Sequence, residues 1–209
     1  MTPELKNAID ALRKIQNNAD MHELADAWKL HSRYIGSQNK RGLKIGDMID
    51  WEYSGPREVV SAFLPHASNK GIKILDAGCG SGLVGEELSK EGYSIIHGAD
   101  IAAKLMNSIP AGIYQELHNI DLNKPISFTD DFFDAVLCVG TFTFGHVKAK
   151  ALIEFIRIVK SGGIIGFTIN EGVFLDHGFK SELDHLVIQK KITQLDFYLS
   201  DYLLSLIHI

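Results

Sequence analysis

The sequence predicts an α/β fold in which a doubly wound, mostly parallel sheet follows an N-terminal helical cap. From residue 72 onward, short apolar stretches alternate with stretches of helical periodicity, as in successive βαβ units. The composition changes near residue 70, where "HASNKG" is a linker rich in turn-forming residues. With 209 residues and 45% hydrophobic content, the chain suffices for one substantial core with an appendage. We therefore expect two parts, a helical cap or lid over residues 1–66 and a sheet domain over residues 67–209.

The helical part is predicted from apolar spacing. Leu5, Ile9 and Leu12 recur at helical intervals, and "MHELADAWKLHSRYI" continues the pattern. A third helix is expected to begin at Gly55 and Pro56, because proline suits the first turn of a helix.

The sheet part is predicted from an alternation of strand and helix. The stretch "DAVLCVG" lacks any polar alternation, which is typical of a strand buried on both faces. Ser161, Gly162 and Gly163 are expected to end the helix that precedes the fifth strand. The expected strands cover 72–77, 93–100, 112–117, 134–140 and 164–170, and the expected helices cover 83–92, 102–109 and 149–160.

Charge and cysteine content narrow the class of protein. The net charge of −5 gives no overall electrostatic footprint for nucleic acid, and the small cluster Lys40, Arg41 and Lys44 is favoured as a solvated loop. Cys79 and Cys138 have no metal-like partner nearby in the sequence, which suits a reducing compartment. Neither a secretory signal nor an apolar run of about 20 residues is present. We expect a soluble, cytoplasmic protein that binds neither membrane nor nucleic acid.

The stretch "ILDAGCGSGLVGEEL" satisfies two glycine signatures at once. Gly80, Gly82 and Gly85 fit the GxGxxG pattern of dinucleotide-binding proteins, whereas Asp76 followed by Gly78, Gly80 and Gly82 fits the loop of enzymes that use S-adenosylmethionine. A glycine turn without a ligand is the third interpretation.

Two carboxylates bear on the choice of ligand. Asp100 ends the second strand, 20 residues after Gly80, where an acid accepts hydrogen bonds from the ribose hydroxyls of either ligand. Asp76 discriminates between them, because a carboxylate about 4–6 Å from a pyrophosphate costs a few kcal/mol in a poorly screened crevice. An ammonium and a sulfonium are attracted instead. The charges therefore favour S-adenosylmethionine.

At these residues the chain resembles the class I S-adenosylmethionine-dependent methyltransferases, from Tyr53 to about Asn170. "ILDAGCGSG" resembles motif I of the family, and four further segments follow in the family's order, including "HNIDLNKPISF" and "FDAVLCVGTFTFGHV". A narrower similarity, carried by "YSGPREVVSAFL" and "VGTFTFGHV", points to the methyltransferase-like group named for the Williams–Beuren syndrome region. The resemblance implies a Rossmann-like domain that binds S-adenosylmethionine. The implied contacts are Asp76, Gly78, Cys79 (through its backbone), Gly80, Gly82, Asp100, Ile101 on adenine, Asp121 to the adenine amino group, Leu122 beside the ring, Val139 and Gly140.

The family's chemistry implies in-line attack of a nucleophile on the sulfonium methyl, with the protein supplying alignment. We expect a small-molecule acceptor, and Phe142 and Phe144 are candidates to line its pocket. An oxygen nucleophile benefits from a general base, for which His146 and Glu171 are candidates; a helix cap for the histidine and a helix entry for the glutamate are the alternatives. Among the N-terminal aromatic residues, Trp28 and Tyr53 either close over the cofactor or pack in the core.

Two further expectations concern a metal and the end of the chain. No HxxH or HxxxH pair lies near a carboxylate, so no metal site is expected. The family usually ends with two strands, the last of them antiparallel and inserted beside the fifth, but "DYLLSLIHI" is short for that purpose. Either the last antiparallel strand is missing or the sixth strand is shorter than the expected "ITQLDFYLS". The first alternative implies a C-terminally incomplete or divergent domain. The alternatives to an active methyltransferase are a non-catalytic S-adenosylmethionine-binding regulatory protein and an NAD(P)-dependent oxidoreductase.

Overall fold

The structure is a computed structural model, and it describes residues 54–143, 147–199 and 203–208. Residues 54–209 form one compact unit, and helix α3 (Gly55–Phe63) belongs to it. The unit therefore begins at Ser54, twelve residues before the expected end of the helical cap. The rest of the predicted cap, including Trp28 and Tyr53, lies outside the described residues.

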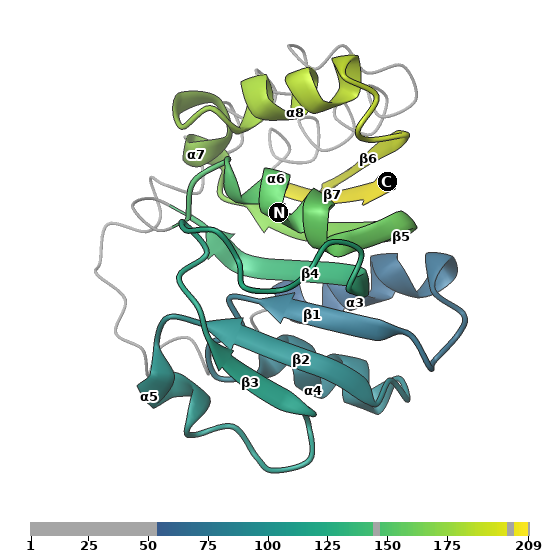
Figure 1. Cartoon of the computed structure of the whole chain (residues 1–209), viewed down its shortest axis with the longest axis vertical. Coiled ribbons are helices and arrows are strands. Elements are labelled where there is room, and N and C mark those ends of the chain that lie inside the picture. The colour runs from purple at the N-terminus through teal and green to yellow at the C-terminus, as the bar shows by residue number, and fades with distance from the viewer. Residues whose placement is uncertain (1–53, 144–146, 200–202, 209) are drawn as a thin grey trace, which may run out of the picture. The chain divides into compact units, whose positions relative to one another are not determined.

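A seven-stranded sheet with the order β3-β2-β1-β4-β5-β7-β6 is the centre of this unit (Figure 1). Strands β1 to β5 are parallel, and β1 lies between β2 and β4. The strand order reverses there, so the carboxyl ends of β1 and β4 border the place where open α/β sheets bind ligands. The five parallel strands are β1 (Lys73–Ala77), β2 (Ile95–Asp100), β3 (Glu116–Asn119), β4 (Phe133–Phe142) and β5 (Val159–Ile169).

Helices cover the sheet as expected for a doubly wound fold. Helix α3 packs against α4 (Leu83–Lys90), and α6 (Ala151–Ile158) packs against β5. No helix in the described ranges is long and apolar enough to cross a membrane. The remaining helical segments are η2 (Leu64–His66), α5 (Ala103–Met106), α7 (Glu171–Asp176) and α8 (Phe179–Ile188).

The chain ends in an antiparallel hairpin that inserts the last strand into the sheet. Strand β6 (Gln194–Leu199) and strand β7 (Leu203–His208) pair along their whole length, and β7 also pairs antiparallel with β5. The alternative in which the last antiparallel strand is missing was wrong. The segment "DYLLSLIHI" was judged too short for a turn and a strand, but six residues on each side of residues 200–202 are enough for the pairing. Because β7 covers β5, the sheet has no unpaired edge at β5.

Two element boundaries differ from the prediction for a packing reason. Strand β3 begins at Glu116, not at residue 112, because Tyr114 turns its side chain beneath α4. Helix α6 ends at Ile158, and Ser161 to Gly163 lie within a bulged first part of β5. A side chain at Gly163 would come within 2.6 Å of the Asp134 carbonyl oxygen, so the bulge requires glycine there.

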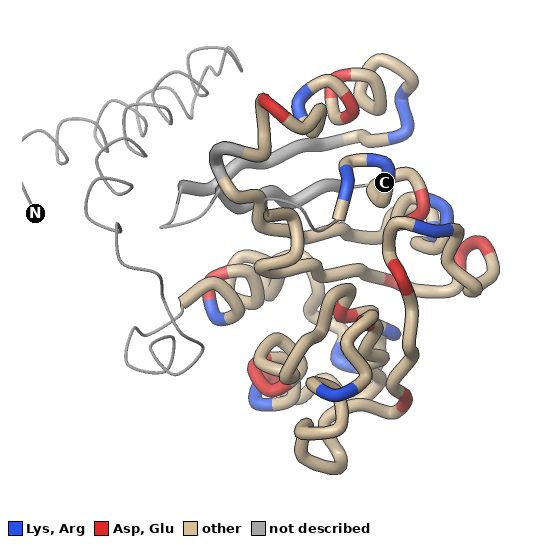
Figure 2. The backbone as a smooth tube through the Cα atoms, turned by 90° about the vertical axis from the view of Figure 1, so that its left-hand side faces the viewer, with Lys and Arg blue, Asp and Glu red and all other residues tan. Residues whose placement is uncertain are grey.

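The central part of strand β4 is confirmed as buried on both faces. Its residues from Ala135 to Cys138 have no exposed surface, as the apolar run "DAVLCVG" predicts. Acidic and basic positions are both scattered over the described backbone (Figure 2).

Candidate cofactor site at the glycine loop

The glycine loop after β1 is fastened to the end of β2. The backbone amides of Gly78 and Cys79 donate to the Ala99 carbonyl oxygen at 2.7 and 3.1 Å. The Gly80 amide donates to Asp100 Oδ2 at 2.8 Å. Because the two strands are parallel neighbours, their ends meet at one edge of the sheet, and these three hydrogen bonds fix the path of the loop over that edge.

The glycines of the loop serve different purposes. A side chain at Gly78 would overlap Thr141, with its Cβ 2.1 Å from the threonine Oγ1, so the space beside Gly78 belongs to the end of β4 and not to a ligand. Gly82 is close to Ile109. At Gly80, with φ of +51°, no atom lies within 4 Å of an added Cβ. Gly80 is therefore the position at which the loop leaves open space.

The absence of a side chain at Gly85 makes room for Tyr114, an aromatic residue that the sequence analysis did not single out. A Cβ at Gly85 would lie 2.3 Å from the Tyr114 ring, and the Gly85 amide donates to the Tyr114 hydroxyl at 3.2 Å. The third glycine of the GxGxxG pattern thus permits packing of Tyr114 against α4. It carries no information about a phosphate.

Asp76 lies beneath the loop and is completely buried. The Tyr114 hydroxyl donates to Asp76 Oδ2, while Oδ1 has no hydrogen-bond partner among the described residues. Burial raises the pKa of the Asp76 carboxyl to about 7, against the opposing effect of the Tyr114 hydrogen bond. The sequence argument placed an ionised Asp76 at the mouth of the loop. That placement was wrong, because the carboxyl lies in the protein interior and is partly protonated near neutral pH.

Asp100 organises the neighbouring turn as well as the loop. Its second oxygen, Oδ1, accepts from the Ala102 amide at 2.7 Å. Asn119 at the end of β3 donates from Nδ2 to the carbonyl oxygens of Asp100 and Ile101, at 3.1 and 2.9 Å. The Ile101 side chain is 67% exposed, which leaves an apolar surface beside the carboxylate. Each oxygen of Asp100 retains a lone pair for a further donor.

The segment after β3 is a turn that Asp121 stabilises. Asp121 Oδ1 accepts from the Asn123 amide at 3.0 Å, and Oδ2 lies 3.3 Å from the Lys124 ammonium. The Asn123 amide, followed by Lys124, lowers the pKa of the Asp121 carboxyl. The neighbouring Leu122 is buried. Asp121 thus has partners of its own in this turn, and its predicted bond to adenine stays a prediction.

At the end of β4, the buried Val139 precedes the exposed Gly140, whose φ is +69° and whose amide donates to Thr168 Oγ1 at 2.8 Å. Phe142 is fully buried against Phe155, Phe167 and Phe179. It belongs to the core, so its expected place in a substrate pocket was wrong.

The two candidate bases are not placed by the structure. Phe144 and His146 lie outside the described residues. Glu171 is the first residue of α7, directly after β5, and its side chain is not described. Their roles in catalysis remain predictions.

The described residues fit the nucleoside of S-adenosylmethionine. Open space at Gly80, a carboxylate at the end of β2 and the exposed apolar side chain of Ile101 lie on adjacent elements at one edge of the sheet. The unpartnered oxygen of Asp76 adds an acceptor beneath the same loop. Each of these groups suits a ribose, an adenine or a cationic amino-acid portion.

The strand order decides between the two glycine signatures. The classic dinucleotide-binding order is 3-2-1-4-5-6, whereas this sheet inserts the antiparallel β7 between β5 and β6. Residues 75–167 also match the family model described as a methyltransferase domain. In this region the chain resembles the class I S-adenosylmethionine-dependent methyltransferases.

Known methyltransferases resemble the chain over more than half of its length. Methyltransferase-like protein 27 of Homo sapiens is 35% identical over 127 residues, which are 58% of this chain and 51% of that protein. A ubiquinone biosynthesis O-methyltransferase of Neisseria meningitidis is 25% identical over 138 residues, 58% of this chain and 57% of that protein. The chain therefore spans about half the length of these curated relatives.

A solved structure shows the same fold. Magnesium protoporphyrin IX methyltransferase from Synechocystis, with S-adenosylmethionine bound, superposes with a TM-score of 0.56 at 17% identity, covering 80% of this chain and 85% of that one.

Proposed function

We propose that the protein transfers a methyl group from S-adenosylmethionine to a small-molecule acceptor. The observation that carries this proposal is the glycine loop, open at Gly80 and held by Asp100, within a sheet that has the inserted strand β7. A small-molecule acceptor is supported by the ubiquinone biosynthesis O-methyltransferases among the relatives, of Neisseria meningitidis and of Dictyostelium discoideum.

In the proposed cofactor site, each residue positions the cofactor and takes no part in bond making. The Asp100 carboxylate accepts from the ribose hydroxyls, and the exposed Ile101 side chain packs on the adenine. The backbone of Gly80 permits close approach of the cofactor, and the buried Asp76 supports the loop from beneath. When bound, the cofactor supplies an electrophilic methyl group, so the protein needs only to hold an acceptor in line with it.

For an oxygen acceptor we propose a general base from the segments after β4 and β5. His146 and Glu171 belong to these segments, which follow the carboxyl ends of strands as substrate-binding loops do in open α/β sheets. Either side chain would take the acceptor's proton as the new bond to carbon forms.

The two alternatives lose the observations that motivated them. The regulatory protein was suggested by a missing last strand, and β7 is present. The oxidoreductase was suggested by the overlapping GxGxxG pattern, in which Gly85 serves the packing of Tyr114.

The test is transfer of a labelled methyl group from S-adenosylmethionine into a metabolite extract. Wild type is compared with Gly80→Ala, which fills the open space, and with Gly92→Ala as matched control. Gly92 also has a positive φ, of +88°, and open space around an added Cβ. It lies in the turn between α4 and β2, at the amino-terminal end of β2 and away from the glycine loop. We expect a labelled product with wild type and Gly92→Ala and at least tenfold less with Gly80→Ala. Tight donor binding without any labelled product would contradict the proposal.

A further inference from the structure

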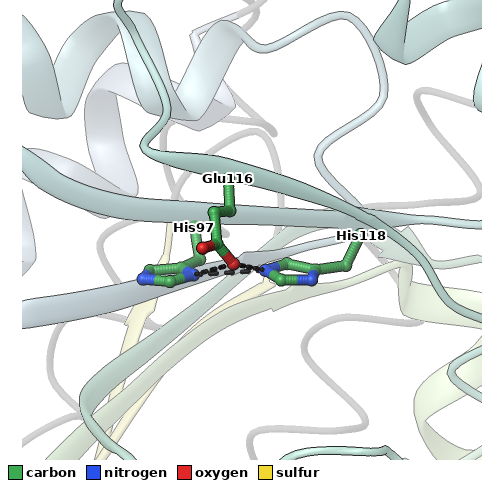
Figure 3. A group of neighbouring side chains, drawn as sticks. All are labelled: His97, Glu116 and His118. Atoms are coloured by element: carbon green, nitrogen blue, oxygen red, sulfur yellow. Dashed lines mark hydrogen bonds and ion pairs between the residues drawn. The ribbon is translucent and has the colours of Figure 1, made fainter.

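A group of three potential metal ligands lies on β2 and β3, away from the glycine loop. His97 is on β2, and Glu116 and His118 are two residues apart on the neighbouring β3. Because side chains alternate along a strand, Glu116 and His118 project to one face. The register pairs Glu116 with His97, and His97 with Leu75 on β1. The three potential ligands therefore lie on the face of the sheet opposite to Asp76. Figure 3 shows the imidazole edges of His97 and His118 turned toward each other, with the carboxylate beside them.

The distances within this group suit a metal ion. His97 Nδ1 and His118 Nε2 are 3.2 Å apart, and Glu116 Oε2 lies 3.5 Å from His118 Nε2 and 3.9 Å from His97 Nδ1. In a tetrahedral zinc site with ligand bonds of about 2.0–2.1 Å, ligand atoms are about 3.3 Å apart. The nitrogen pair is already at that separation. A small rotation of Glu116, whose side chain is 65% exposed, brings the carboxylate to it.

The surroundings hold the two imidazoles in place. The His97 side chain is 8% exposed and that of His118 is 23% exposed. The ring of Phe133 packs edge-on against His97, with 5.4 Å between the ring centroids, and the ring of Phe128 packs edge-on against His118, with 4.8 Å between the centroids. These contacts limit the rotation of both imidazoles.

The donor set defines the class of ion. Two imidazoles and one carboxylate form a recognised zinc set that leaves a fourth position open for water. Imidazole nitrogen disfavours Mg²⁺ and Ca²⁺, which prefer oxygen ligands.

We propose that His97, Glu116 and His118 bind a zinc ion that joins β3 to β2. Strand β3 is the outermost strand on its side of the sheet and has only four residues, so a metal bridge to β2 secures the edge. The site is independent of methyl transfer and of the cofactor.

The experiment is calorimetric titration of the full chain with ZnCl₂ alone, after treatment with a chelator. The variants are His118→Ala and Glu116→Gln, and His185→Ala on α8 is the matched control, an exposed histidine of a different element. Loss of a residue that only supports a metal ligand weakens binding about 10- to 100-fold, so loss of a ligand is expected to weaken it at least about 100-fold. We expect wild type to bind zinc, His118→Ala to show this loss, Glu116→Gln to show a smaller loss, and His185→Ala to bind as wild type does. MgCl₂ is expected to give no comparable binding.

Thermal unfolding in the chelator shows whether each variant is folded, so that loss of binding is not loss of structure. If His118→Ala and Glu116→Gln bind zinc as wild type does, or if His185→Ala loses as much affinity as they do, the proposal is wrong.

Discussion

At the residue scale, two carboxylates at the ends of adjacent strands have opposite environments. Asp76 is buried with one hydrogen-bond donor, and its pKa is raised to about 7. Asp100 is at the surface of the loop and accepts two backbone hydrogen bonds. The two carboxylates therefore have different roles: Asp100 holds the loop and Asp76 supports it from beneath.

The raised pKa of Asp76 predicts a pH-dependent stability. The pKa of Asp76 in the folded protein, about 7, exceeds the usual aspartate value of 3.8, so the folded protein binds more protons between these pH values. The free energy of unfolding therefore falls as the pH rises from about 4 to about 7, by on the order of a few kcal/mol. Asp76→Asn removes the titration. Urea denaturation at pH 5 and pH 8 should show a smaller difference for Asp76→Asn than for wild type, and equal differences would contradict the assignment.

Asp100→Asn is the cleaner test of the ribose contact. Asp100→Ala would also remove the acceptors of the Gly80 and Ala102 amides, so it disrupts the loop itself. The amide keeps the shape and one of the two acceptor oxygens, but it loses the charge and places an NH2 group, which cannot accept, where the other oxygen was. We expect S-adenosylhomocysteine to bind about 1–3 kcal/mol more weakly. Glu91→Gln, an exposed change of the same kind, should leave the dissociation constant unchanged. An unchanged constant for Asp100→Asn would remove Asp100 from the site.

At the scale of elements, Arg157 on α6 anchors the segment that leads from β3 to β4. Its guanidinium donates to the carbonyl oxygens of Ile126 and Phe128, both at 2.8 Å, and it pairs with Glu154 and Asp130. Glu154 in turn accepts from the Ile126 amide at 2.8 Å. The turn at Asp121, which is predicted to contact adenine, is therefore followed by a segment that is hydrogen-bonded to α6 in the other half of the sheet.

Arg157→Ala is expected to lower the free energy of unfolding by about 1–3 kcal/mol, because the carbonyl and carboxylate partners lose their donors. Arg57→Ala on α3 is the control, an exposed arginine whose loss should change stability by less than about 0.5 kcal/mol. The comparison is made by urea denaturation of both variants. Equal effects of the two changes would show that the anchor contributes nothing specific.

Periodicity predicted the elements that bury an unbroken apolar face, such as β4 and α6, within a few residues. It failed where a tertiary contact decides the path. Tyr114 lies before β3 and contacts Gly85 and Asp76, and nothing in the local sequence predicts these contacts. The occupant of the space at Gly78 is Thr141, 63 residues later in the chain, so its identity depends on the fold.

At the scale of the whole molecule, the strand order carries more information than any single motif. The glycine loop alone left two ligands open, and the charge argument on Asp76 assumed an exposed carboxylate. The insertion of β7 separates the two folds. The group His97, Glu116 and His118 escaped a search for helical spacings because it combines a two-residue spacing on β3 with a residue of β2.

The central claim is that the domain binds S-adenosylmethionine through the loop around Gly80. The most direct measurement is thermal unfolding of the full chain with S-adenosylhomocysteine and, separately, with NADH. At 100 times its dissociation constant a ligand stabilises the folded state by about 2.7 kcal/mol, which corresponds to a rise in Tm of roughly 5–10 °C for a chain of this size. We predict this rise with S-adenosylhomocysteine, its loss in Gly80→Ala, and no rise with NADH. A rise with NADH and none with S-adenosylhomocysteine would contradict the claim.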